Sequence, residues 1–222
     1  MTPEELYEKE REEREKAAQV AHEIRVCTAA GCLSLQSEAL KTALEDEVKG
    51  SDDKTSCRVK GVGCLGLCAS GPLVSVVPEG ALYAKVQPGD APELVASLGS
   101  EPLARLRLDT EVPFFQQQTK VVLENSGVID PEEITDYVAA GGYQALATAV
   151  TEMTPLDIIN EVMKSGLRGR GGAGYPTGLK WMTVGKALSD TKYVICNADE
   201  GDPGAFMDRS VLEGDPHRVL EG

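Results

Sequence analysis

Four of the six cysteines lie in two pairs whose spacing suits metal or redox chemistry. Cys27 and Cys32 form a CxxxxC pair at the end of one predicted strand, and Cys64 and Cys68 form a CxxxC pair directly after another. Two pairs at strand ends can converge on one point, where four thiolates can bind zinc or an iron–sulfur cluster. Zinc knuckles more often use the tighter CxxC spacing, so these wider loops favour a binuclear cluster with two cysteines on each iron.

The residues between and after the second pair also favour a cluster. In "CLGLCASGP", Gly66, Ala69 and Gly71 are small enough to let backbone N–H groups approach the sulfurs of an anionic cluster. Cys57 and Cys196 fit no ligand pattern, and we expect both to be buried small apolar residues. Zinc, and unliganded cysteines in a core, remain the alternatives for the four paired residues.

A glycine-rich stretch, "SGLRGRGGAGYPTGLKW" at 165–181, contains Gly169, Gly171 and Gly174 in the GxGxxG pattern. A dinucleotide-binding Rossmann loop must follow a β-strand and open a helix whose N-terminus faces the pyrophosphate. Here a predicted helix ends at Gly166, immediately before the glycines. The Rossmann interpretation therefore fails on context.

The same stretch still offers what a phosphate site needs, which is inward-turning backbone N–H groups beside a cation such as Lys180. A flexible linker is the alternative, but linkers seldom carry Arg168, Arg170, Tyr175 and Trp181 among their glycines. Composition and context favour a phosphate cradle.

Downstream, "KYVICNADEGDPGAFMDR" predicts a buried strand at 192–196 that runs into a polar loop. Ligands bind in loops at the carboxyl ends of strands in open α/β sheets. The Asn197 amide suits the edge of a flavin ring, while Asp199, Glu200 and Asp202 can accept hydrogen bonds from ribityl or ribose hydroxyls. The alternative is an acidic surface turn.

Composition limits the partners of the chain. Its 222 residues include 22 basic and 36 acidic side chains, a formal net charge of −14 that disfavours nucleic acids and anionic membrane surfaces. No apolar run approaches the roughly 20 residues of a membrane span, and the amino terminus lacks a signal-peptide core. We therefore expect a cytoplasmic protein, where cysteines serve metal or redox chemistry rather than disulfides.

The elements that must position these motifs follow from periodicity and capping signals. Thr2, Pro3 and Glu5 form a capping box that starts a charged helix to about residue 22. The order β-α-β-β-β-α then predicts a compact α/β domain. Its predicted elements are strands at 23–29 and 54–63, a helix at 37–50, a hairpin over 72–86 that turns at Pro78 to Gly80, and a short helix at 90–99.

A helical connector is predicted to follow this domain. Residues 113–127 are expected to be helical and packed on their neighbours through Phe114 and Phe115. A second helix starts at Asp130, Pro131 and Glu133 and breaks at Gly141 and Gly142. A third, over 153–166, is capped by Thr154, begins at Pro155, is supported by Asp157 and ends at Gly166.

Residues 25–98 resemble the thioredoxin-like ferredoxins that carry a [2Fe-2S] cluster. The resemblance rests on CxxxxC, about thirty intervening residues, then CLGxC and GP, and it covers the whole module. It implies a [2Fe-2S] cluster held by Cys27, Cys32, Cys64 and Cys68. Such modules occur in respiratory complex I and in NAD-linked hydrogenases.

Taken together, "GLRGRGGAGYPTGLKW" and "NADEGDPGAFMDR" resemble the family of FMN- and NADH-binding subunits of complex I. The chain is most similar to fused relatives, the diaphorase subunits of NAD-reducing and electron-bifurcating hydrogenases and of NAD-linked formate dehydrogenases. Four parts are then expected: a charged helix at 1–24, the [2Fe-2S] domain at 25–100, the connector at 101–164 and the first part of a Rossmann-like α/β flavin domain at 165–222.

The resemblance also implies the roles of individual residues. Tyr175, where many relatives have Phe, stacks with NADH, and Asp202, where Glu is usual, meets the same nucleotide with a shorter reach. No side chain is required as an acid or base, so no catalytic residue is expected. The FMN contacts implied are Gly169, Arg170, Gly171, Gly172, Lys180, Asn197, Asp199 and Glu200.

The function implied is transfer of hydride from NAD(H) to FMN and of single electrons through iron–sulfur clusters to a partner such as a hydrogenase or formate dehydrogenase. Relatives continue with a second glycine-rich loop and a [4Fe-4S] motif, which we expect only beyond these residues. The alternative is a non-catalytic [2Fe-2S] electron-transfer and docking module with an incomplete flavin domain.

Overall fold

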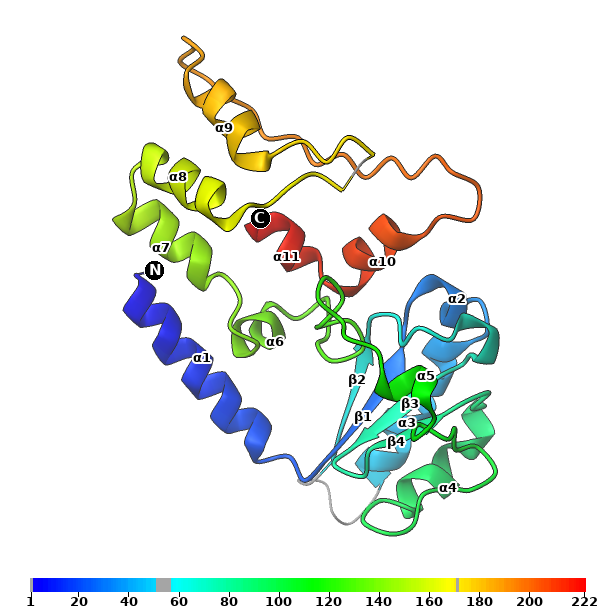
Figure 1. Cartoon of the computed structure of the whole chain (residues 1–222). Coiled ribbons are helices and arrows are strands. Elements are labelled where there is room, and N and C mark those ends of the chain that lie inside the picture. Colours follow the sequence, from blue (N-terminus) through cyan, green and yellow to red (C-terminus); the bar gives the residue numbers. More distant parts are fainter. Residues whose placement is uncertain (1, 51–56, 171) are drawn as a thin grey trace. The chain divides into compact units, whose positions relative to one another are not determined.

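The computed structural model describes residues 2–50, 57–170 and 172–222, and the chain forms two compact units (Figure 1). The sheet lies in the larger unit, whereas the glycine-rich loop lies in the smaller one. The larger unit comprises Lys9–Gly142 and Ala198–Leu220, and the smaller unit comprises Met1–Glu8, Tyr143–Asn197 and Glu221–Gly222.

A four-stranded mixed sheet with the order β2-β1-β3-β4 forms the centre of the larger unit. β1 pairs in parallel with β2 and antiparallel with β3, and β3 pairs with β4 across the predicted hairpin. The strands are β1 (His22–Cys27), β2 (Cys57–Val62), β3 (Val74–Val77) and β4 (Ala81–Tyr83).

Helix α3 (Ser37–Gly50) packs against β1, β2 and α4 (Ala91–Ala96). Its apolar residues recur every four positions, so Leu40 and Leu44 fall on one face and are fully buried with Ile24 of β1. Removing each such side chain from water contributes roughly 2 kcal/mol. The predicted order β-α-β-β-β-α is confirmed, with a short α2 (Ala30–Leu33) and two 3₁₀ turns, Cys68–Ser70 and Pro88–Asp90, added.

The amino-terminal helix α1 (Pro3–Ala18) starts as predicted. Thr2 and Glu5 cap it reciprocally: each backbone N–H donates to the other side chain, at 2.8 and 3.3 Å. The predicted end near residue 22 is wrong, because β1 begins at His22 and its pairing with β2 requires extended backbone there.

The connector is less helical than the sequence predicts. Within 113–127 only one helix forms, α5 (Pro113–Gln116). Phe114 contacts Phe115 edge-to-face but is 60% exposed, so the predicted packing is wrong for Phe114, whereas Phe115 is partly buried. Three of the next residues, Thr119, Val121 and Val122, are β-branched and have low helix propensity, which accounts for the early end. The later helices are α6 (Ile134–Ala139), α7 (Gln144–Glu152) and α8 (Pro155–Ser165).

The two predicted helix starts in the connector differ in outcome. α6 begins at Ile134, after Glu133 as N-cap, because Asp130 forms a tight turn in which its carboxylate accepts the backbone N–H of Glu132 at 3.0 Å. The start of α8 is confirmed, since Thr154 and Asp157 form the predicted capping box.

The predicted buried strand at 192–196 is wrong. A strand exists through hydrogen bonds to a neighbouring strand, and no such partner pairs with this segment among the described residues. Its apolar side chains are consequently exposed, by 81% at Tyr193 and 99% at Val194. Around it the chain forms α9 (Thr177–Gly185), α10 (Met207–Gly214) and α11 (Pro216–Glu221). In the described part of the chain, no helix is long and apolar enough to cross a membrane.

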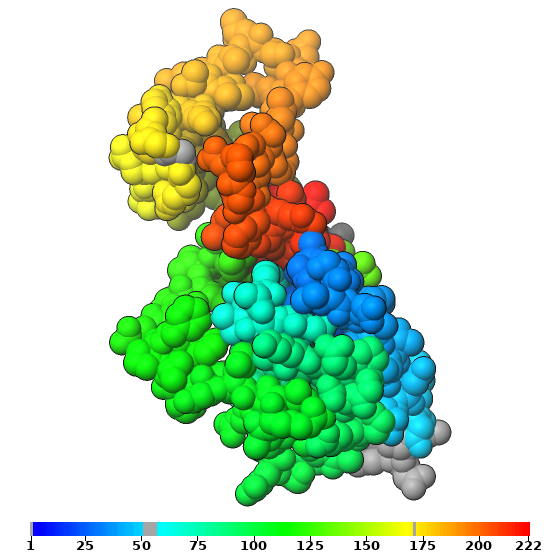
Figure 2. Space-filling model, turned by 90° about the vertical axis from the view of Figure 1, so that its right-hand side faces the viewer, coloured from blue at the N-terminus to red at the C-terminus, as the bar shows by residue number. Residues whose placement is uncertain are grey.

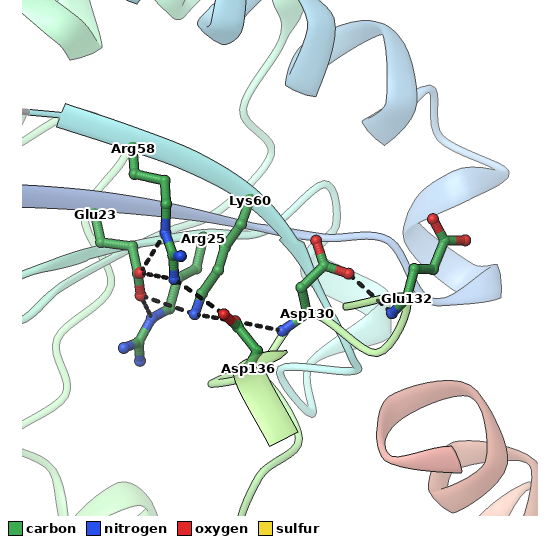
Figure 3. A network of polar contacts seen from close by, with 7 residues as sticks. All are labelled: Glu23, Arg25, Arg58, Lys60, Asp130, Glu132 and Asp136. Carbon is green, nitrogen blue, oxygen red and sulfur yellow. Dashed lines mark hydrogen bonds and ion pairs between the residues drawn. The ribbon is translucent and has the colours of Figure 1, made fainter. Parts of the chain in front are cut away.

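A network of ion pairs joins the sheet to the connector (Figure 3). Lys60 of β2, only 9% exposed at its side chain, lies 3.2 Å from the Glu23 carboxylate of β1 and 2.8 Å from the Asp136 carboxylate of α6. Burial is the largest single influence and raises the pKa of both carboxyl groups, but Lys60 and the other hydrogen-bonding partners together outweigh it and hold each pKa below its ordinary value. Arg25 and Arg58 also bond Glu23, and the backbone N–H of Asp130 donates to Asp136.

We predict that Lys60→Met lowers the free energy of unfolding by about 2 kcal/mol at neutral pH, because it removes the more buried of the two cations, Lys60 and Arg58, that bridge the Glu23 and Asp136 carboxylates. A lowered folded pKa stabilises the fold above the ordinary values of 4.5 for Glu23 and 3.8 for Asp136, and this contribution is lost as pH falls through the folded pKa. Denaturant unfolding between about pH 7 and pH 3 should therefore show a flatter pH dependence for the variant.

Lys49→Met is the matched control, since Lys49 is 72% exposed and lies 3.9 Å from its partner, Asp46. It should leave both the stability and its pH dependence close to those of the unmodified protein. Equal pH profiles for Lys60→Met and the unmodified protein would contradict the assigned role of the network.

Candidate functional site: the cysteine cluster and the glycine-rich loop

The pairing of β1 with β2 brings the two cysteine loops to one edge of the sheet. Cys27, the last residue of β1, pairs with Val62, the last residue of β2, so both strands end at the same level. Because the strands are parallel, the chain leaves both of them in the same direction. Cys32 then follows in α2, and Cys64 and Cys68 follow β2.

The sulfur atoms lie at distances suited to shared metal ions. Cys64 Sγ and Cys68 Sγ are 3.8 Å apart, and two thiolates on one tetrahedral metal with bonds of about 2.3 Å are also about 3.8 Å apart. The two loops also contact each other. A Cβ at Gly31, in the first loop, would lie 3.4 Å from Cys68 Sγ, and a Cβ at Gly71 would lie 3.0 Å from Cys32 Sγ.

Hydrogen bonds to sulfur favour the thiolate of Cys32, whereas the pKa values of the other three paired cysteines are raised. The backbone N–H of Gly66 donates to Cys64 Sγ at 3.3 Å. A hydrogen bond with the Cys27 thiol, aided by the backbone N–H of Leu73, lowers the pKa of Cys32 to about 7. The hydrogen bond with Cys32 raises the pKa of Cys27, and the hydrogen bond with Cys27 raises the pKa of Cys64. Ionising all four thiols together therefore requires positive charge between them, which metal ions supply.

The four cysteines differ in exposure. Cys27 and Cys32 are each 1% exposed and pack with Leu73, whereas Cys64 is half-buried and Cys68 is exposed. Among the described residues, no group of three or more acidic, histidine or cysteine side chains is arranged to hold a single metal ion. The two cysteine pairs fit a cluster of two metal ions in which each metal ion has two cysteine ligands. The role of these cysteines as ligands stays a prediction.

The other two cysteines lie apart from this cluster. Cys57 begins β2, at the end opposite Cys64, and packs on the main core, where burial raises the pKa of its thiol to about 11. Cys196 is exposed, so the predicted burial of this residue is wrong. Its position explains this, because the segment that carries it has no pairing strand among the described residues.

The glycine-rich stretch is a loop closed at its base and open at its tip. α8 ends at Gly166 in the left-handed conformation, so a helix precedes the glycines as predicted. The Gly169 N–H donates to the Tyr175 carbonyl at 2.9 Å, and Arg168 Nε donates to the Gly174 carbonyl at 2.8 Å. Helix α9 follows the loop directly.

The predicted ligand groups of this loop face open space. A Cβ at Gly172 would meet nothing within 4 Å, and Tyr175 is 52% exposed. Arg170 lies in the loop, with its guanidinium donating to the Arg168 carbonyl, and Lys180 is exposed in the first turns of α9. Open glycine backbone beside two cations suits a phosphate group. Gly171 lies outside the described residues.

The predicted acidic contacts are divided between the two units. Asn197 belongs to the smaller unit, whereas Asp199, Glu200 and Asp202 belong to the larger one. The Glu200 carboxylate accepts the backbone N–H groups of Asp208 and Arg209, at 2.9 and 3.1 Å, and so caps the start of α10. Its hydrogen-bonding capacity is thus already used in part by the protein.

Sequence reasoning missed two side chains beside the cysteine loops. Ser126 Oγ donates to the Cys64 carbonyl at 3.0 Å, and a Glu213 carboxylate oxygen accepts the Ala30 N–H at 3.3 Å. Both residues lie far from the cysteines in the sequence, and no local pattern marks either of them.

Two family models match separate parts of the chain. The family model of the thioredoxin-like [2Fe-2S] ferredoxin matches residues 13–99, and that of the Nuo51 FMN-binding domain matches residues 162–222. One part of the chain thus matches a thioredoxin-like [2Fe-2S] ferredoxin domain and another part matches an FMN-binding domain, the two resemblances that the sequence predicts.

Curated relatives of two kinds match the chain. The "NADP-reducing hydrogenase subunit HndC" of Solidesulfovibrio fructosivorans is 56% identical over 106 residues, which cover 48% of this chain and 21% of the relative. An NADH-quinone oxidoreductase subunit of Rhizobium meliloti is 53% identical over 102 residues, covering 46% and 24%. The matches thus span about a fifth to a quarter of each relative.

Two solved structures are also similar. The thioredoxin-like [2Fe-2S] ferredoxin of Aquifex aeolicus is 25% identical, with a TM-score of 0.39, over 40% of this chain and 98% of that one. An NAD⁺-reducing [NiFe]-hydrogenase in the H₂-reduced state is 22% identical, with a TM-score of 0.35, over 91% of this chain and 34% of that one.

We predict that replacing any one of Cys27, Cys32, Cys64 or Cys68 by Ala removes most of the bound iron and acid-labile sulfide, because one of the two irons then loses one of its two protein ligands. Cys57→Ala removes a sulfur atom from the same domain and should leave the iron content unchanged. Metal and sulfide analysis of the purified variants measures both. Full iron content in any one of the four cysteine-to-alanine variants would refute the ligand assignment. Zinc without iron in the unmodified protein would refute it as well.

Proposed function

We propose that the protein is a diaphorase-type NAD(H):acceptor oxidoreductase subunit, which takes hydride from NADH and passes single electrons to a partner such as a hydrogenase or formate dehydrogenase. The observation that carries the proposal is the union, in one chain, of a ferredoxin match over four converging cysteines and an FMN-binding match over the glycine-rich loop. One-electron and two-electron chemistry are then available in one protein.

The proposed cofactor ligands divide into two sets. FMN accepts two electrons as hydride and releases them singly, which is the chemistry that this cofactor supplies when bound. The [2Fe-2S] cluster takes the four paired cysteines. The FMN phosphate takes the glycine backbone from Gly169 to Gly172 with Arg170 and Lys180, and Asn197, Asp199 and Glu200 serve the rest of the flavin.

The residues of the chain then act by binding and by charge. Arg170 and Lys180 neutralise phosphate charge at the open loop, and the exposed ring of Tyr175 offers a stacking surface for NADH, with Asp202 as its hydrogen-bond acceptor. No side chain accepts or donates a proton in hydride transfer. Cys68, exposed at the sheet edge, provides the outlet for electrons toward a partner.

The partners follow from the relatives, which are named as subunits of a hydrogenase and of a quinone oxidoreductase. We propose that this chain is likewise one subunit of a multi-subunit redox complex in the cytoplasm, joined to other iron–sulfur subunits. Its formal net charge of −14 favours basic protein surfaces over nucleic acids or anionic lipids.

A second candidate function is a non-catalytic electron-transfer and docking module. The observation in its favour is that Glu200, a predicted flavin contact, already caps α10 with its carboxylate. In that case the cluster carries electrons and residues 165–222 serve only as a docking surface.

We predict that the native complex shows the visible absorbance of oxidised flavin and that NADH bleaches it.

Lys180→Gln should weaken FMN binding tenfold or more, since a charge-assisted hydrogen bond to phosphate contributes about 1.5–3 kcal/mol. Lys186→Gln, at the other end of the same helix, is the matched control and should leave FMN affinity unchanged. Fluorescence titration of FMN measures both affinities.

The same preparation separates the two candidate functions. A cluster signal in electron paramagnetic resonance without flavin absorbance would refute the diaphorase and support the electron-transfer module. Equal FMN affinities for Lys180→Gln and Lys186→Gln would refute the assigned cradle.

A further inference from the structure

Helix α10 contacts the first cysteine loop at its C-terminal end. A carboxylate oxygen of Glu213 accepts the backbone N–H of Ala30 at 3.3 Å, and Ala30 lies between Cys27 and Cys32. The other carboxylate oxygen of Glu213 accepts from Arg209 Nε at 2.6 Å, one turn earlier on α10. The side chain is thus held from its own helix while it bonds the loop.

The next residue of α10 contacts the second cysteine loop. A Cβ added to Gly63 would lie 2.6 Å from the Gly214 Cα, so the two backbones approach this closely because Gly63 has no side chain. Ser126 lies at the same contact, where its hydroxyl donates to the Cys64 carbonyl. In Figure 2, the orange-red segment that contains α10 and α11 lies against the blue and cyan surface of the larger unit.

The opposite end of α10 is bonded to the acidic loop, because Glu200 caps the helix. A helix of eight residues is about 12 Å long. α10 therefore fixes the spacing between the acidic loop and both cysteine loops, and each of these contacts lies within the larger unit.

We infer that Glu213 is a positioning residue for the iron–sulfur cluster: it holds the Cys27–Cys32 loop in place through Ala30 and sets a negative charge beside it. The inference rests on the proposed function, in which these cysteines hold a [2Fe-2S] cluster. Negative charge beside a cluster opposes its reduction, because the added electron makes the cluster more negative. Glu213 then keeps the reduction potential of the cluster low.

The test compares Glu213→Gln with Glu161→Gln in the holoprotein. Glu161 lies on α8 with its carboxylate 69% exposed, and it loses the same charge without contact with a cysteine loop. We expect Glu213→Gln to shift the one-electron equilibrium toward the reduced cluster by up to about tenfold, which corresponds to 59 mV. Glu161→Gln should leave it unchanged, and a redox titration followed by electron paramagnetic resonance measures the potential.

A conservative variant and a second readout distinguish positioning from simple stability. Glu213→Asp retains the charge with a shorter reach, so it should restore much of the original potential while leaving the Ala30 amide less protected. Hydrogen exchange of the Ala30 amide, which needs no cluster, should quicken in Glu213→Gln and Glu213→Asp. Gly63→Ala should quicken exchange across α10, whereas Gly89→Ala, whose Cβ meets nothing within 4 Å, should not.

Each outcome bears on one of the two hypotheses. If the unmodified protein shows no iron–sulfur signal, the proposed function fails. The hydrogen-exchange result then still decides whether Glu213 and Gly63 hold the cysteine loops in place. If the signal is present but Glu213→Gln changes neither the potential nor the exchange of Ala30, the inference is overturned and the proposed function stands.

Discussion

The parallel register of β1 with β2 is the constraint on which the candidate site depends. Because Cys27 pairs with Val62, two cysteine pairs separated by more than thirty residues meet at one sheet edge. A shift of one residue would turn Ile24 and Val26 out of the core that α3 covers. The buried apolar face therefore fixes the register, and the register brings the sulfurs together.

Polar contacts then hold the neighbouring segments to this sheet. Lys60, on the strand that leads to Cys64, bonds the connector through Asp136, and Ser126 of the connector bonds the Cys64 carbonyl. The connector is thus bonded to β2 just before its last residue and to the loop just after it. It supports the second cysteine loop and is more than a spacer between domains.

Local patterns in the sequence predicted the ferredoxin half well. The four-residue spacing of Leu40 and Leu44 predicted helix α3, and the spacing of the cysteines predicted the candidate site. Apolar character alone was insufficient at Tyr193 and Val194, because a strand also needs a partner to bond with. The contacts of Glu213 and Gly214 were out of reach for a similar reason, since they join segments more than a hundred residues apart.

The uneven exposure of the cysteines has a chemical consequence. Three sulfurs are shielded to some degree, while Cys68 lies at the surface. In the proposed function, the exposed Cys68 is the ligand through which electrons leave, and it is also the sulfur that dissolved oxygen and peroxides can reach. Thiolate sulfur is oxidised where it is accessible. The exposure that would serve electron transfer to a partner thus also makes this sulfur vulnerable to oxidation. A partner docked over Cys68 would protect the same atom that it receives electrons from.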